Sequence, residues 1–484
     1  MQGSSKDEEE PHGREEKSLV DNGDASWGGE FKSKPRLRRK KTHSQIHYEH
    51  NKRFVSCSVL IIGMASFIRG CDLGLLPSVL VPMQREFSLN MWQLQMLVSG
   101  AMISAAFGSL LCGAITDSIG PRNTLVSGLE VICFGMLIMV IADERKTMPL
   151  MIGRIVIGVG FGITRVVSPT FIGEISSRAQ RKGLIEINSI LALLGPCIGF
   201  AYSFIFKQDW RWCIVSLGTL SGVWSVVTVW LLPRSPRWLL AKGRTSEAEE
   251  VIRSVVQEPN HVRKNVVVKS LIAMMKYESK SWGSTIYDEN NSSKIQKTVG
   301  ISLINQLTGI EAVLYYSIIT LTRVGVAEQS SLYVGLAMVN SLLLGTMFSV
   351  IAADCLGIAR RFSMCIGSCG VFATCLAIAC LSEQGWLDQY NASAFFILYS
   401  LCFGLAYGAL DCTFIFANFG SSYRLKSLAL NTFCNRLGAF LVSVSYLYSI
   451  RQVGLGGTYL LFFGMAVVGF IFFPSSAVET KSIT

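Results

Sequence analysis

Long apolar runs recur along this chain of 484 residues, and they constrain its fold more than any other feature. Each run is close to the ~20 residues that an α-helix needs to cross the hydrocarbon core of a bilayer. A β-barrel would show short segments of alternating hydrophobicity, so helices are the remaining way to satisfy the backbone in lipid. The sequence therefore predicts an all-α membrane protein with twelve transmembrane helices, at about residues 54–83, 96–116, 124–142, 149–171, 184–206, 212–232, 299–321, 332–353, 362–381, 392–417, 428–448 and 456–474.

Composition agrees with this interpretation. Half of the residues are hydrophobic, 16% are charged and the mean hydropathy is +0.42, which is too apolar for a soluble domain of this length. The fourteen cysteines lie mostly inside the apolar runs and lack metal-ligand spacing, which favours core packing over a disulfide framework. The sequence shows no nucleophile triad or phosphate loop. We therefore expect a protein that is not an enzyme and has no cofactor, metal or nucleic-acid partner.

The net charge of +11 reflects membrane topology. Basic residues precede the first run and occupy every second connection after it. By the positive-inside rule, this pattern predicts that both termini are cytosolic. We expect a multi-pass protein of the plasma membrane, with the vacuolar membrane as the alternative.

The polar stretch 237–298 divides the apolar runs into two sets of six. We predict an N-terminal bundle at 54–236, a cytosolic linker at 237–298 and a C-terminal bundle at 299–474. Residues 1–53 and 475–484 are predicted to be cytosolic tails, the first of them disordered because it is polar and charged. Within the linker, Ser246 and Glu249 form a capping-box pattern that predicts a short amphipathic helix.

The two halves echo each other at an offset of roughly 240 residues. Asp117 and Arg122 match Asp354 with Arg360 and Arg361, and Arg181 matches Arg424. Such a repeat of six helices predicts a binding site where the halves meet. Rocking of one half against the other would then expose the site to each side in turn.

Asp72 lies in the middle of the first apolar run. A carboxylate at the centre of a transmembrane helix costs at least roughly 2.5–3.5 kcal/mol, so an intramembrane acid is a functional-site hypothesis. In contrast, Gly158, Gly160 and Gly162 in the fourth run indicate close helix packing.

Several motifs resemble those of the major facilitator superfamily and, within it, the sugar porter family. The most specific are Pro233-Arg-Ser-Pro-Arg-Trp-Leu239 and Asn305-Gln306-Leu-Thr-Gly309-Ile-Glu311, the second of which is similar to the family's QQLSGIN-type segment. With an acid at position 311, the segment resembles that of the plant polyol and monosaccharide branch of the family. The resemblance implies two pseudo-symmetric six-helix bundles that transport a polyol or monosaccharide with a proton.

The resemblance also implies roles for individual residues. Asp72 would take the proton and Arg154 would hold the carboxylate deprotonated at other stages. The implied substrate-binding residues are Asn305, Gln306, Glu311, Asn340, Asn435, Ser189 and Phe414. The implied gating charges at the cytosolic helix ends are Asp117, Arg122, Glu174, Arg181, Arg237, Asp354, Arg360, Arg361, Arg424 and Glu479. For the arginines, the alternative is that they only fix topology and meet lipid headgroups; for an isolated asparagine, it is interhelical hydrogen bonding.

The chain also departs from the family pattern. Arg69 lies three residues before Asp72 on the same helix face, and permanent pairing of the two would stop proton cycling. Asp411 stands where the family has a hinge proline in its tenth helix, and Phe419 and Arg234 replace acids. Three hypotheses therefore stay open: a proton symporter, a passive facilitator of the same solutes, and a nontransporting receptor-like paralogue.

Overall fold

The computed structural model describes residues 49–143, 147–177, 180–206, 209–257, 261–274, 282–354, 360–408, 415–416 and 418–476. Residues 48–484 form one compact unit. Ten of the described helices are long and apolar enough to cross a membrane by length and composition.

The first half contains six long helices. They are α1 (Lys52–Glu86), α2 (Met91–Ile119), α3 (Pro121–Val140), α4 (Met148–Ile175), α5 (Arg181–Ile205) and α6 (Trp210–Leu231). Local sequence sets several of their starts. Asn90 and Gln93 form a reciprocal capping box at α2, and the Asp209 carboxylate accepts hydrogen bonds from the first backbone N–H groups of α6.

The second half is less regular along the chain. Its helices are α11 (Glu289–Leu307), α12 (Ile310–Tyr315), α13 (Ser317–Arg323), α14 (Glu328–Asp354), α15 (Arg360–Glu383), α16 (Gln389–Tyr407) and α18 (Arg424–Ser476). The seventh predicted span is broken into α11–α13, and Gly309 at the first break has φ +91°, a conformation that favours glycine. The long α18 holds two predicted spans joined at Gly454, which is not helical. These two features reconcile the ten candidate helices with the twelve predicted spans.

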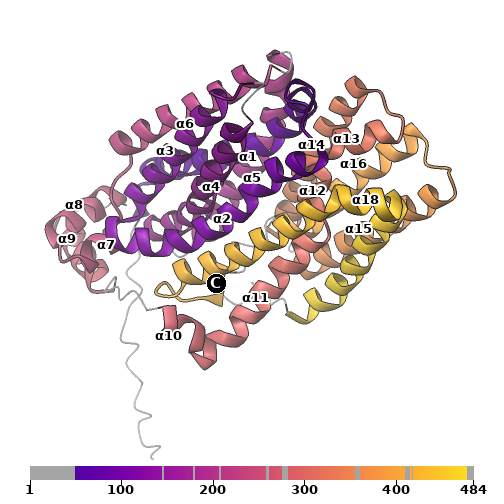
Figure 1. The fold of residues 1–484 in the computed structure, drawn as a ribbon. Coiled ribbons are helices and arrows are strands. Elements are labelled where there is room, and N and C mark those ends of the chain that lie inside the picture. Colours follow the sequence, from indigo (N-terminus) through magenta and orange to yellow (C-terminus); the bar gives the residue numbers. More distant parts are fainter. Residues whose placement is uncertain are drawn as a thin grey trace, which may run out of the picture. The chain divides into compact units, whose positions relative to one another are not determined.

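The two halves lie side by side and meet along α2 with α18 and α5 with α14 (Figure 1). Within the first half, glycines let the helices approach closely. A Cβ atom at Gly158 or Gly162 would lie 2.3 or 2.1 Å from a carbonyl oxygen of α2, and one at Gly160 would lie 2.7 Å from a carbonyl oxygen of α3. These separations are too short for a side chain, so the predicted packing role of this glycine series is confirmed.

The linker between the halves contains short helices: α7 (Pro236–Ala241), α8 (Thr245–Val255), α9 (His261–Met274) and α10 (Trp282–Tyr287). α8 is amphipathic as predicted, with Ala248, Ile252 and Val255 buried. The predicted capping box is wrong. α8 begins at Thr245 with Arg244 at its N-cap, two residues ahead of the predicted cap Ser246, and it has no side-chain cap. Glu249 pairs with Arg253 one turn later instead of with the helix start.

Residues 49–51, directly ahead of α1, are ordered, although they fall in the tail 1–53 that is predicted to be disordered. Strand β1 (Glu49–His50) pairs antiparallel with β2 (Val256–Gln257), which follows α8. The Asn51 backbone N–H donates to Val255 O at 2.8 Å, and α1 begins at Lys52. The boundary predicted at residue 53 therefore falls inside a helix, because the linker supplies partners for the backbone just before it.

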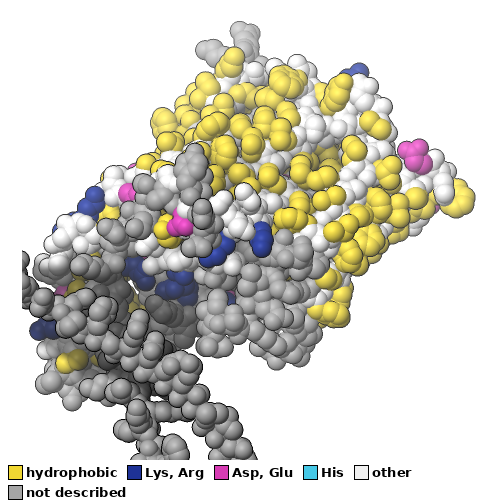
Figure 2. Space-filling view, turned by 90° about the horizontal axis from the view of Figure 1, so that it is seen from below, with side chains coloured by type: hydrophobic (Ala, Val, Ile, Leu, Met, Phe, Trp, Pro, Cys, Tyr) yellow, Lys and Arg dark blue, Asp and Glu magenta, His cyan; other side chains and the backbone are white. Residues whose placement is uncertain are grey.

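Large hydrophobic side chains cover much of the outer surface of the helices (Figure 2). The most exposed include Trp230 at 82% and Ile141 at 75%, on α6 and after α3. Apolar patches of this extent are not typical of a soluble monomer, whereas they suit contact with lipid tails.

Candidate solute cavity and proton site

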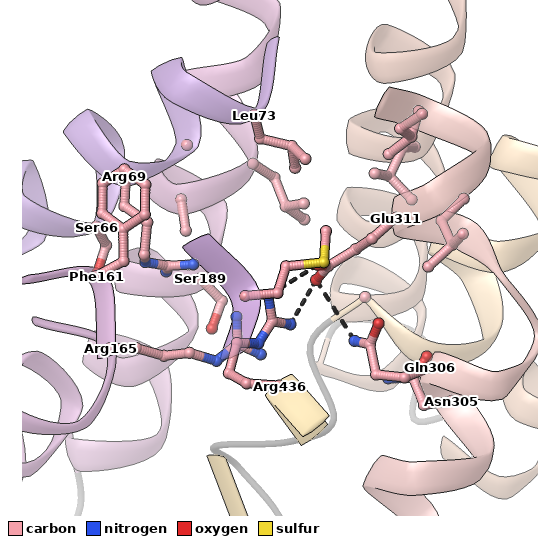
Figure 3. Close-up of a pocket in the computed structure, with 18 of the residues that line it drawn as sticks. Ser66, Arg69, Leu73, Phe161, Arg165, Ser189, Asn305, Gln306, Glu311 and Arg436 are labelled. Carbon is pink, nitrogen blue, oxygen red and sulfur yellow. Dashed lines mark hydrogen bonds and ion pairs between the residues drawn. The ribbon is translucent and has the colours of Figure 1, made fainter. Parts of the chain in front are cut away.

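A cavity of about 200 Å³ lies between the two halves (Figure 3). The first half lines it from α1, α2, α4 and α5, and the second half from α11, α12, α14, α16 and α18. Arg69, Phe161 and Ser189 on the first side lie near the middle of their helices. The cavity is therefore at mid-depth of the bundle, where the internal repeat predicts a binding site.

Four of the predicted substrate-binding residues line this cavity: Asn305, Gln306, Glu311 and Ser189. Asn435 lies directly behind the lining and is fully buried. Its Oδ1 accepts a hydrogen bond from Gln306 Nε2 at 3.3 Å. Asn435 therefore orients the lining residues. Phe414 lies outside the described residues.

Asn340 is a correction to the prediction. It is exposed, its Nδ2 donates to Leu336 O of its own helix at 2.9 Å, and it is not among the described residues that line the cavity. The reason is helical geometry. Leu342 lines the cavity from the same helix, and two positions along an α-helix correspond to a rotation of about 200°.

Glu311 is held in an ion pair inside the cavity wall. Arg436 Nη1 donates to Glu311 Oε2 at 2.8 Å and Nη2 donates to Oε1 at 2.5 Å, a two-pronged contact typical of arginine and carboxylate. Gln306 Nε2 also approaches Oε1 at 3.5 Å. Both oxygens of the acid are therefore engaged by the protein itself.

Arg165 and Arg436 are cavity residues that the sequence analysis missed. They lie on α4 and α18, and Asn435 Oδ1 accepts from Arg165 Nη2 at 3.3 Å and from Arg436 Nη2 at 2.6 Å. The signal for both was the one used for Asp72, a charge inside an apolar run.

Asp72 pairs with Arg154, as the family resemblance implies. Arg154 Nη1 donates to Asp72 Oδ1 at 2.7 Å and Nε donates to Leu97 O at 3.0 Å. Their side chains are 7% and 1% exposed, beside a second hollow of about 10 Å³ with apolar walls. Water is thus nearly excluded from this pair.

Arg69 does not neutralise Asp72 in this structure. Asp72 Oδ2 has no hydrogen-bond partner among the described side chains and backbone, whereas Arg69 lines the larger cavity. The ion pair between Arg69 and Asp72 that would stop proton cycling is therefore not formed in this structure. Tyr315 connects the two places, since it lines the cavity and lies within electrostatic reach of both Asp72 and Arg154.

At the predicted cytosolic end, the described residues include one charge contact between the halves: Lys426 Nζ on α18 lies 3.2 Å from Asp117 Oδ2 on α2. Other predicted gating residues also make contacts within their own half. Glu174 accepts from Ser235 Oγ at 2.5 Å, with Arg181 and Arg237 in electrostatic reach. Three arginines donate to backbone carbonyls: Arg122 to Leu232 O, Arg181 to Ser176 O and Arg424 to Phe419 O. The side chains of Asp354, Arg360, Arg361 and Glu479 lie outside the described part of the chain.

The halves also touch at the opposite end. Arg85 Nη2 at the end of α1 lies 2.5 Å from Glu328 Oε2 at the start of α14. Nearby, the rings of Phe204 and Tyr333 stack with centroids 5.3 Å apart. The cavity therefore has contacts between the halves above and below it.

The sequence of this chain is similar to those of known transporters. A family model described as "Sugar (and other) transporter" matches residues 56–484. The chain is 25% identical over 463 residues to "Probable polyol transporter 4" of Arabidopsis thaliana, covering 90% of this chain and 86% of that protein. It is 26% identical over 396 residues to "Plastidic glucose transporter 4" of the same plant, covering 80% and 70%.

A solved structure shows the same fold. The proton:xylose symporter XylE bound to 6-bromo-6-deoxy-D-glucose superposes with a TM-score of 0.75 over 89% of this chain and 97% of that one, at 17% identity. A partially occluded inward open form of XylE from E. coli gives the same TM-score.

Fold and cavity together define a transporter of the major facilitator superfamily, which is a multi-pass integral membrane protein and not an enzyme. The chain belongs to the sugar porter family of that superfamily. The predicted fold class and family are confirmed.

Proposed function

We propose that this chain carries a monosaccharide or polyol through the cavity by alternating access, and that a proton on Asp72 drives the cycle. The observation that carries the proposal is the closeness of two features on α1. Arg69, Gly70 and Leu73 line the solute cavity. Asp72 lies between them in sequence and forms the buried ion pair with Arg154. Any movement of α1 that follows proton uptake therefore moves a wall of the cavity.

The cavity suits a small hydroxylated solute. Its volume of about 200 Å³ is below the roughly 300–1,000 Å³ typical of sites for drug-sized ligands. Side-chain amides of Asn188, Asn305 and Gln306 supply donors and acceptors, and Phe161 and Phe403 supply apolar walls. A sugar or polyol needs both, because its hydroxyl groups must be hydrogen-bonded once they leave water.

Protonation of Asp72 would remove the negative partner of a guanidinium that is 1% exposed. An unpaired buried charge is unfavourable, so Arg154 would favour a different arrangement of α1 and α4. The family members named above include a proton:xylose symporter, which supports this coupling as a proposal. A carried charge also responds to membrane voltage, by roughly 2.3 kcal/mol per 100 mV.

Alternating access then requires the contacts at the two ends to break in turn. Asp117–Lys426 would open toward the predicted cytosolic side, and Arg85–Glu328 would open toward the other. Both are ion pairs with at least one partner partly exposed, so each is weak enough to exchange with water.

The test is uptake of labelled hexose and polyol by cells that lack endogenous sugar uptake, at several external pH values and with an uncoupler. We expect saturable accumulation that increases with acidity and is abolished by the uncoupler. Asp72→Asn should equilibrate the solute without accumulating it, and Glu249→Gln on the linker helix α8 should behave as wild type.

Uptake that does not change with pH or uncoupler would refute the proton mechanism and indicate passive facilitation. Absence of saturable uptake for every sugar and polyol tried, with the protein present in the membrane, would refute transport of these solutes.

A further inference from the structure

The buried ion pair between Asp72 and Arg154 leaves one atom of each side chain unpaired. Asp72 Oδ1 accepts from Arg154 Nη1 at 2.7 Å, whereas Asp72 Oδ2 has no hydrogen-bond partner among the described side chains and backbone. Arg154 Nη2 likewise has none there. The two side chains are only 7% and 1% exposed, and buried polar atoms are normally hydrogen-bonded. An unpaired acceptor and an unpaired donor on one ion pair therefore indicate a site for a small polar ligand.

The hollow beside this pair has the size of one water molecule. It measures about 10 Å³, and a buried water needs roughly 10–15 Å³ together with two to four polar partners. Asp72 and Arg154 both line the hollow and supply two such partners. Its other described lining residues are apolar: Leu75, Leu76, Val79, Met136, Met139, Ile157 and Ile214. One water therefore fits the hollow, whereas a sugar or polyol is far too large for it.

The hollow lies inside the first half and apart from the solute cavity. Its lining comes from α1, α3, α4 and α6, and it shares no described lining residue with the larger cavity. On α1 the lining residues follow Asp72 toward Glu86, where that helix ends. Met139 lies near the end of α3 and Ile214 near the start of α6. The hollow is therefore on the side of Asp72 that faces away from the predicted cytosolic end.

The groups around Asp72 limit how a proton can reach it from this side. The titratable neighbours include Arg154 on α4, Tyr315 on α12 and Cys71 on α1. Tyr315 borders the solute cavity and not the hollow. The described lining residues of α3 and α6 are methionines and an isoleucine, which carry no exchangeable proton. A water molecule is therefore the carrier that can reach Asp72 Oδ2 through the hollow.

We propose that the hollow binds one water molecule, which donates to Asp72 Oδ2, accepts from Arg154 Nη2 and delivers the proton to Asp72. In this step a hydronium ion at the water site gives one proton to Oδ2. The carboxylate becomes a neutral carboxylic acid and the hydronium becomes water, while Oδ1 stays beside Arg154 Nη1. The proton thus travels through the first half, whereas the solute passes between the halves. This inference rests on the proposed proton-driven transport and adds the route of the proton.

The experiment fills the hollow with a methylene group. Val79 lines the hollow, so Val79→Ile places one more carbon where the water would bind. The purified full-length protein is reconstituted in liposomes with the labelled hexose or polyol that the wild type takes up fastest. Two rates are measured: accumulation driven by an inward pH gradient, and exchange of labelled for unlabelled solute at equal pH. Exchange does not require Asp72 to lose and regain its proton.

We expect Val79→Ile to accumulate solute about tenfold more slowly, as for the loss of one hydrogen bond to a charged group, and to exchange it at the wild-type rate. Ile214→Met fills the hollow from α6 with a flexible side chain and should show the same difference between the two rates. Val81→Ile is the matched control. Val81 lies on the same helix as Val79 and is not among the described lining residues of either cavity, so neither rate should change.

The outcomes separate this route from the transport proposal. Wild-type accumulation by both Val79→Ile and Ile214→Met overturns the water route and leaves Asp72 as the proposed proton site. Loss of exchange together with accumulation in both variants assigns the hollow to packing or to the movement of α1, and it also overturns the route. Wild-type protein that exchanges solute but never accumulates it overturns the proton mechanism, and absence of both activities overturns transport itself.

Discussion

Replacing Asp72 by asparagine tests the energetics of the buried pair directly. The substitution keeps the side-chain shape and an oxygen that can accept from Arg154 Nη1, but it removes the charge that balances a guanidinium 1% exposed. Breaking a buried ion pair from one side costs about 3–5 kcal/mol. Because the amide oxygen keeps one hydrogen bond and Arg154 Nε keeps Leu97 O, we expect the lower end, about 3 kcal/mol.

The assay is equilibrium unfolding of the purified protein by SDS titration in mixed micelles, followed by fluorescence of its nine tryptophans. The double variant Asp72→Asn/Arg154→Gln removes both charges. It should be more stable than Asp72→Asn alone, with a coupling energy of about 2 kcal/mol. Arg253→Gln breaks a pair whose side chains are 42% and 37% exposed, so its effect should stay within roughly 0.5 kcal/mol.

Strictly additive effects of Asp72→Asn and Arg154→Gln would refute the reasoning, because they would show that the two charges do not depend on each other. An Asp72→Asn variant as stable as wild type would do the same. The result also decides how the uptake of this variant is interpreted, since a folded protein that fails to accumulate solute has lost coupling and not structure.

Two further predictions concern packing and gating. Gly162→Val should destabilise the protein by at least about 1–3 kcal/mol in the same unfolding assay, since a Cβ there would lie 2.1 Å from Ala105 O, whereas Gly183→Ala has open space and should be neutral. Asp117→Asn should raise the labelling of a cysteine introduced at the lining position Ser189 by up to roughly fivefold, because the Asp117–Lys426 pair is partly exposed and worth at most about 1 kcal/mol. The exchange Asp117→Lys/Lys426→Asp should restore wild-type labelling, and unchanged labelling in all variants would show that this pair does not hold the halves together.

Hydropathy alone predicts most of the fold, because lipid leaves the backbone no alternative to helices. The break of the seventh span and the joining of the last two spans are different. Both depend on single glycines, Gly309 and Gly454, with φ values of +91° and +80°. A sequence shows that glycine permits such a turn, but the packing around it decides whether the turn is made.

The candidate site was predictable to the extent that a residue's type fixes its surroundings. Asp72 and Arg154 are charges within apolar helices, and such charges have to find partners. The prediction that Asn340 binds substrate was wrong because an asparagine is tolerated on several helix faces. Its orientation therefore depends on how α14 is rotated against its neighbours. Hydrogen bonding to Leu336 O satisfies it without any ligand.

Glu311 shows why charged positions cannot be transferred from a family one at a time. An acid placed in the cavity wall brings an unfavourable charge, and the structure compensates it with Arg436, 125 residues further along the chain. That arginine in turn shares an acceptor with Arg165 of α4, since both donate to Asn435 Oδ1. Charges in such a bundle therefore occur as sets, and the role of an acid such as Glu311 depends on its partners and not only on its match to the family motif.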